Sequence, residues 1–225
     1  MAPGHLTRGS RRAASDLLGE GSGRWHHELV GRLDDLEHVH QEDPAGWRAW
    51  LEREHERSPG IWLVTWRKAS GRPVLAYDDI VEEALCFGWI DSKAAKVDDD
   101  RTRLLLTPRK ARSSWSRSNK VRWAAMEASR LVAPAGVAVV DTATADGSWS
   151  RLDDVEDLVV PADLAVAFGG HAGSRQQWDD FPPSARRGIL EWIVTAKRPD
   201  TRARRIDETA RLAAQGELAN QWPRP

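Results

Sequence analysis

The sequence predicts an α+β fold, with a small antiparallel β-sheet and packed helices in the N-terminal half and a mainly α-helical C-terminal half. Three observations support this prediction. Residues 61–66 form a β-branched and aromatic run between turn residues. Residues 89–107 alternate in character around an acidic turn, as a β-hairpin does. Beyond residue 115, apolar residues recur mainly at helical spacing.

The first elements are a helix and a strand. Asp43 can cap the helix and Pro44 suits its first turn, and the helix should end near residues 58–60. Its apolar face is formed by Trp47, Trp50 and Leu51. The strand over residues 61–66 follows directly, with Trp62, Val64 and Trp66 on one face.

A second helix and a hairpin follow. This helix is expected to begin near Asp78, where acidic residues stand at its start. Its apolar face is formed by residues at helical spacing: Tyr77, Ile80, Val81, Ala84 and Leu85. The hairpin strands cover residues 89–97 and 101–107. Alternation puts these residues on the apolar face: Ile90, Ala94, Leu104 and Leu106. The opposite face carries Trp89, Asp91, Lys93, Arg103 and Leu105. That face is either solvated or a site.

The rest of the chain is predicted to be helical. Ser116 caps a helix whose inward residues are expected to be Val121, Ala124, Ala125, Ala128 and Leu131. Further helices are expected after the prolines at 134, 161, 183 and 199. We therefore expect a flexible arm over residues 1–24, an α+β domain over 25–147, and a helical region over 148–225 that packs on it as one unit.

The composition limits the binding partners and the cellular compartment that we expect for this protein. The 33 basic and 34 acidic residues nearly cancel, so no overall field favours nucleic acid. The basic run over residues 197–205 is interleaved with acidic residues and is interpreted as a solvated helix face. No apolar run is long enough for membrane insertion. The single cysteine, Cys86, and the absence of a secretory signal favour a cytoplasmic location.

The candidate site is the hairpin and the turn after it. Arg103 and Arg109 offer forked donors to a carboxylate or phosphate, and Trp89 and Trp115 could form an aromatic wall. An ordinary cross-strand ion pair at Asp91 is an equally valid interpretation. The predicted ligand-binding set is Trp66, Tyr77, Trp89, Asp91, Lys93, Arg103, Arg109, Trp115, Ser116 and Asn119.

Three blocks of this sequence resemble the YdeI/OmpD-associated family, also described as bacteriocin-protection proteins. They are residues 77–91, then Thr107-Pro108-Arg109 together with residues 114–119, and finally residues 196–206, which follow a helix that includes Trp192. The resemblance implies a link to protection against antimicrobial peptides and to an outer-membrane porin, with no agreed active site. The chain departs from the family pattern at Gly188 and over residues 148–173.

Other groups of residues give weaker evidence for a functional site. His38 and His40 fall on one side of a strand, with His26 and His27 nearby, but no further ligand completes a metal site. Cys86 is more readily interpreted as a small core residue than as a nucleophile. Glycines 19, 21 and 23 follow no strand, which argues against a nucleotide loop. No metal or cofactor is expected.

These observations leave three function classes open. The favoured one is a binding protein for a small anionic or amphipathic molecule, such as an antimicrobial, because 12 Trp residues supply aromatic surface that could line a pocket. An enzyme in the same pocket would show a displaced pKa, most plausibly at Asp91 or Cys86. An interaction module with a protein partner would show an exposed apolar patch near Trp192 or Trp222.

Overall fold

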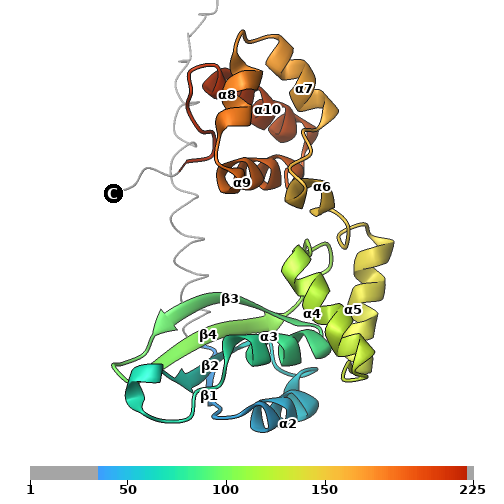
Figure 1. Ribbon diagram of the computed structural model, residues 1–225. Coiled ribbons are helices and arrows are strands. Elements are labelled where there is room, and N and C mark those ends of the chain that lie inside the picture. The colour runs from blue at the N-terminus through green and yellow to red at the C-terminus, as the bar shows by residue number, and fades with distance from the viewer. Residues whose placement is uncertain (1–34, 222–225) are drawn as a thin grey trace, which may run out of the picture.

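A computed structural model describes residues 35–221 (Figure 1). Its sheet has the strand order β1-β2-β4-β3, formed by β1 (Glu37–His40), β2 (Ile61–Trp66), β4 (Arg101–Pro108) and β3 (Trp89–Lys96). The predicted α+β class is confirmed. The sheet is mixed, because β1 pairs with β2 in parallel while the other pairs are antiparallel. The predicted flexible arm lies outside the described residues.

Two helices cover one face of the sheet (Figure 1). In α2 (Pro44–Glu54), the Asp43 side chain accepts a hydrogen bond from the Gly46 amide at 2.8 Å, which caps the helix. Helix α3 (Tyr77–Cys86) follows a short 3-10 helix, η1 (Lys68–Ser70). The apolar face predicted for α2 is confirmed: Trp47, Trp50 and Leu51 are buried in one core with Ile61, Leu63 and Leu106. The opposite face of the sheet carries the buried residues Trp62, Val64 and Leu105.

The register of the hairpin corrects the predicted division of its faces. A β-bulge lies between Asp91 and Ala94. Asp91 pairs with Leu106 and Ala94 pairs with Leu104, so both lie on the core face. Trp89 is 1% exposed and belongs to the same core. The prediction that Trp89 and Asp91 share a face with Arg103 was therefore wrong, because the extra residues of the bulge break the alternation.

Helices α4 (Arg117–Ala128) and α5 (Pro134–Ala145) follow the hairpin. Gly136 lets α5 approach the end of α3 closely, since a Cβ atom there would lie 2.3 Å from the Cys86 carbonyl oxygen. The prediction for the inward face of α4 was wrong: Val121 is 64% exposed, and Trp123 is the buried residue of this helix. Trp123 packs with Val81, Leu85, Trp115 and Ala143 in a further core cluster.

The remaining helices form a separate apolar core, which includes Leu164, Trp178, Ile193 and Ala210. They are α6 (Asp153–Glu156), α7 (Ala162–Gly169), α8 (Ser174–Asp180), α9 (Pro183–Val194) and α10 (Pro199–Ala213). Figure 1 shows α7 to α10 as one group, with α6 between that group and α4 and α5. Among residues 35–221, no helix is long and apolar enough to cross a membrane.

Candidate functional site

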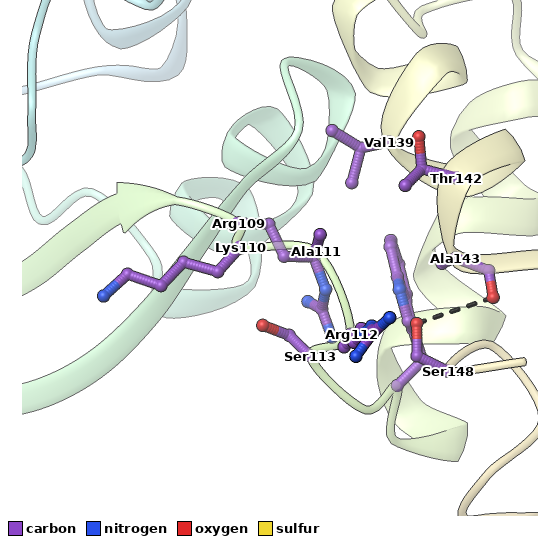
Figure 2. A pocket seen from close by; sticks show the side chains of 10 residues that line it. Arg109, Lys110, Ala111, Arg112, Ser113, Val139, Thr142, Ala143 and Ser148 are labelled. Atoms are coloured by element: carbon purple, nitrogen blue, oxygen red, sulfur yellow. Dashed lines mark hydrogen bonds between the residues drawn. The ribbon is translucent and has the colours of Figure 1, made fainter. Parts of the chain in front are cut away.

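A small cavity lies where the end of strand β4 meets helix α5 (Figure 2). Its volume is about 140 Å³, roughly ten times the 10–15 Å³ that one water molecule needs. The lining residues are Arg109, Lys110, Ala111, Arg112, Ser113, Trp115, Val139, Thr142, Ala143 and Ser148. Arg109 and Arg112 are cationic, the Lys110 amine points away from α5 (Figure 2), and no lining residue is acidic, so the cavity favours an anion.

Arg109 is the central residue of this cavity. Its backbone amide donates to the Gly88 carbonyl at 2.9 Å, which continues the hairpin pairing and places the side chain. The guanidinium carbon lies 3.9 Å from the centroid of the Trp115 ring, and Nη2 donates to the Ser114 carbonyl at 2.5 Å. Arg109 is only 8% exposed, and burial lowers its pKa to about 10, so it remains a cation at neutral pH.

Three donors at this position have no hydrogen-bond partner among the described residues. They are Nε and Nη1 of Arg109 and Nε1 of Trp115, all of them buried. Buried donors in proteins are nearly always paired, and an unpaired buried donor costs about 1–3 kcal/mol. An unpaired set beside a cavity therefore indicates that a solvent molecule or a ligand supplies the missing acceptors.

The loop that carries Arg109 is held in place by Asp146. One carboxylate oxygen of Asp146 accepts from the Arg112 amide at 2.9 Å, and the other accepts from the Ser148 amide at 2.8 Å. The Ser148 side chain makes the largest contribution, followed by the Ser148 amide, in keeping the pKa of Asp146 below its ordinary value. Arg112 adopts the left-handed conformation, with φ at 63°, and its carbonyl accepts from Arg151 Nη1 at 2.7 Å. The cavity wall is thus fixed before any ligand arrives.

The opposite wall of the cavity is apolar and rigid. Val139 and Ala143 come from α5, and Thr142 lies beside them (Figure 2). Behind the cavity, the Trp115 ring contacts two further indoles, with centroid distances of 4.9 Å to Trp149 and 6.2 Å to Trp123. The buried Ser148 hydroxyl donates to the Ala143 carbonyl at 3.5 Å, so it is already paired.

Among the residues predicted for the site, Tyr77 and Asp91 form a pair close to Arg109. The Tyr77 hydroxyl donates to Asp91 Oδ2 at 2.8 Å. Burial and this hydrogen bond raise the pKa of Tyr77. The Asp91 carboxylate favours the charged form of Arg109, although the two form no ion pair. Asp91 is therefore a neighbour of the cavity and not part of its lining.

The other residues predicted for the site cap a helix, pack in the core or lie on the surface, away from the cavity. Ser116 caps α4, because its hydroxyl accepts from the Asn119 amide at 3.3 Å. Trp89 donates to the His55 carbonyl at 3.2 Å from within the core. Trp66 donates to Glu42 Oε1 at 2.8 Å, and Arg103 stacks over Trp62, so both lie away from the Arg109 cavity. Lys93 is exposed.

Most of the cavity lining was not predicted from the sequence. Arg112, Val139 and Ser148 were not among the predicted residues, and neither was Asp146, which holds the loop. The turn that ends α5 was visible in the sequence as Asp146-Gly147-Ser148. Nothing local indicated that its carboxylate binds a loop 34 residues earlier in the chain.

The described residues provide neither a metal-binding cluster nor an activated cysteine. Within residues 35–221, no group of three or more potential metal ligands occurs. His38 Nε2 lies 2.9 Å from Arg103 Nη1, and the His40 ring contacts Trp66. His26, His27 and the glycines at 19, 21 and 23 lie outside the described residues. Cys86 is fully buried, and its pKa is raised to about 11, mainly by burial, so the thiol is protonated at neutral pH.

Comparison with protein families divides the chain into two matched regions. Residues 39–139 match a domain of unknown function (DUF8412). Residues 157–216 match the family described as Bacteriocin-protection, YdeI or OmpD-Associated. The C-terminal helices form a YdeI/OmpD-associated domain. The predicted family is therefore confirmed for this part of the chain. The comparisons with curated proteins and with solved structures give no match.

The candidate cavity lies outside the YdeI/OmpD-associated domain. Residues 109–139 of its lining belong to the matched domain of unknown function, and Thr142, Ala143 and Ser148 lie between the two matched regions. The cavity is thus a property of the N-terminal half and its junction with the C-terminal domain. The description of the C-terminal family does not say what this cavity binds.

Proposed function

We propose that this protein binds a small anion, or the anionic group of a small amphipathic molecule, in the Arg109 cavity without transforming it. The observation that carries the proposal is Arg109 itself, a buried cation with two unpartnered nitrogen atoms beside a cavity. Isolated buried charges are costly, and proteins normally pair them. An anion in the cavity would supply the missing partner.

The geometry also supports selection of the ligand. Trp115 covers one face of the Arg109 guanidinium, so a ligand meets its N–H groups at the edge or on the other face. The wall formed by Val139 and Ala143 could contact a short apolar group attached to the anion. Few polar groups in an otherwise apolar lining are the usual composition of small-molecule sites.

Binding fits better than catalysis at this site. The enzyme hypothesis required a titratable group with a displaced pKa beside a positioned partner. The displaced pKa of Cys86 moves upward, and the thiol is packed in the core away from the cavity lining, which opposes a role as nucleophile.

The biological setting is part of the proposal. The family description of the C-terminal domain names bacteriocin protection, and sequestration of an antimicrobial molecule in the Arg109 cavity is one way to provide it. We propose a cytoplasmic location, which the single buried cysteine favours. A protein partner at the C-terminal domain is the second candidate. Trp192 is half-buried against Arg205 rather than part of an open patch, and Trp222 lies outside the described residues.

Thermal unfolding and Trp fluorescence in a series of anions at constant ionic strength test the proposal. The key variant is Arg109→Met, which removes the charge and keeps a long side chain on Trp115. Lys110→Met is the matched control, because Lys110 is the adjacent cation and points away from α5 (Figure 2). Constant ionic strength keeps the screening of surface charges the same for every anion tested.

We expect saturable stabilisation by at least one anion in the wild type, its loss in Arg109→Met, and its retention in Lys110→Met. A ligand present at about 100 times its Kd should stabilise the wild type by about 2.7 kcal/mol. Equal loss in both variants would mean unspecific surface attraction. If no anion stabilises the wild type, the cavity holds only solvent and the proposal is wrong.

A further inference from the structure

A second arginine distinguishes this cavity from a simple monoanion site. Arg112 lines the same small cavity as Arg109. Its backbone is held in the left-handed region by Asp146 and Arg151. That conformation costs about 1–2 kcal/mol for a residue other than glycine, and such outliers concentrate at functional sites. Arg130, Leu158 and Asn220 share this conformation, and at Arg112 it turns the loop so that this residue lines the cavity.

Neither arginine forms an ion pair in the described part of the chain, although the Asp91 carboxylate favours the charged form of Arg109, and Arg112 is exposed. The Arg112 side chain makes no hydrogen bond or ion pair there, and Arg109 makes no ion pair. Asp146 is already bound by two backbone amides, and Asp91 accepts the Tyr77 hydroxyl. Like charges that line one cavity disfavour each other until an anion enters between them. An anion between them would accept hydrogen bonds from both guanidinium groups and relieve this repulsion.

We infer that the anionic group bound by Arg109 and Arg112 carries two negative charges, as a phosphate or phosphate monoester does. This inference rests on the proposed function and adds the class of the ligand. A phosphate group presents three or more acceptor oxygens in a compact tetrahedron, which suits two guanidinium groups at a cavity of about 140 Å³. A planar monocarboxylate offers one charge and two oxygens.

A comparison of methyl phosphate with methanesulfonate tests the effect of ligand charge on binding while the shape of the ligand stays the same. Both have a tetrahedral head and one methyl group, and they differ by one negative charge above pH about 6, the second pKa of a phosphate monoester. Binding is measured by isothermal titration calorimetry at pH 7.5 and at pH 5, at constant ionic strength. Inorganic phosphate is included to distinguish a free oxyanion from an esterified one.

We expect methyl phosphate to bind about tenfold more tightly than methanesulfonate at pH 7.5, and the difference to shrink at pH 5. Arg112→Gln should lower the affinity for methyl phosphate about tenfold and leave methanesulfonate within about threefold. Arg112→Lys keeps the charge and should retain the preference. Lys110→Gln, the matched control, should change neither affinity by more than about threefold.

The outcomes separate the two proposals. Equal binding of the two methyl compounds by the wild type, or an unchanged preference in Arg112→Gln, overturns the dianion inference while the anion-binding function stands. If neither compound nor inorganic phosphate binds, the dianion inference is overturned, and the anion series with Arg109→Met decides whether the anion-binding function stands. Tight binding of inorganic phosphate with exclusion of methyl phosphate supports the inference and assigns the free ion as the source.

Discussion

The guanidinium carbon of Arg109 lies 3.9 Å from the centroid of the Trp115 ring, and both side chains are almost completely buried. This stack is one of several Arg–Trp contacts in the protein, but it borders a cavity and leaves polar atoms unpartnered. A cation–π contact at a desolvated site contributes about 2 kcal/mol. That attraction offsets only part of the cost of burying the charge.

Replacement of Arg109 therefore tests whether this residue serves stability or a ligand. In Arg109→Met, the buried charge disappears and the aliphatic contact with Trp115 remains. In a chloride buffer without other anions, we expect the free energy of unfolding to stay within about 1 kcal/mol of the wild type or to rise. Trp115→Ala should lose about 3–5 kcal/mol. Urea unfolding followed by circular dichroism measures both, and a loss above about 2 kcal/mol in Arg109→Met would instead make Arg109 a structural residue.

The approach of α5 to α3 predicts a contrast between two glycines. In Gly136→Ala, the new Cβ atom would lie 2.3 Å from the Cys86 carbonyl oxygen, so a helix must shift. We expect a loss of about 1–3 kcal/mol. Gly188→Ala in α9 is the control, since nothing lies within 4 Å of its Cβ position. That variant should gain about 0.5–1 kcal/mol from helix propensity. Equal effects of the two substitutions would contradict the close contact.

The thiol of Cys86 should be inert in the folded protein. It is fully buried, and burial raises its pKa to about 11. Reaction with a disulfide reagent at pH 7.5 should therefore be slow in native buffer and rapid in urea, with a rate that follows the unfolded fraction. Fast labelling without denaturant would show that the thiol is accessible and would reopen the nucleophile hypothesis.

Ion pairs at α6 connect the two halves of the chain. Arg187 on α9 donates to both oxygens of Glu156, at 2.9 and 3.1 Å. On the other side, Arg117 of α4 pairs with Asp157 at 2.6 Å, and Lys120 pairs with Asp153. We expect Glu156→Gln to cost about 1 kcal/mol and to reduce the salt dependence of unfolding. Glu54→Gln, which breaks an exposed pair with Arg57 in and just after α2, should have almost no effect.

The Glu156 carboxylate also predicts how the free energy of unfolding depends on pH. The Arg187 hydrogen bonds hold the pKa of Glu156 below its ordinary value of 4.5. Its contribution is therefore complete above pH 4.5 and is lost as the pH falls through the lower folded-state pKa. The difference in stability between wild type and Glu156→Gln should close over that acidic range. A constant difference down to pH 2 would contradict the role of the ionised pair.

Local patterns in the sequence predicted the elements well. The Asp43 cap, the apolar face of α2 and the strand at 61–66 depend on neighbours a few residues away, and the structure confirms them. Predictions that depended on packing were less successful. In α4, residues at regular helical spacing were expected to be buried, but Trp123 is the buried one, because α3 and α5 contact the helix from that side.

By itself, the sequence determined the α+β class, the order of most elements except α6 and α8, and the family of the C-terminal domain. Tertiary structure decided the site. The β-bulge after Asp91 reassigned the faces of the hairpin, and Asp146 joined the Arg112 loop to the end of α5 across 34 residues. Helix caps and alternation arise from short-range sterics and hydrogen bonds, which a sequence displays directly. A cavity arises where segments distant in the chain meet, and its buried, unpartnered Arg109 becomes visible only after they have met.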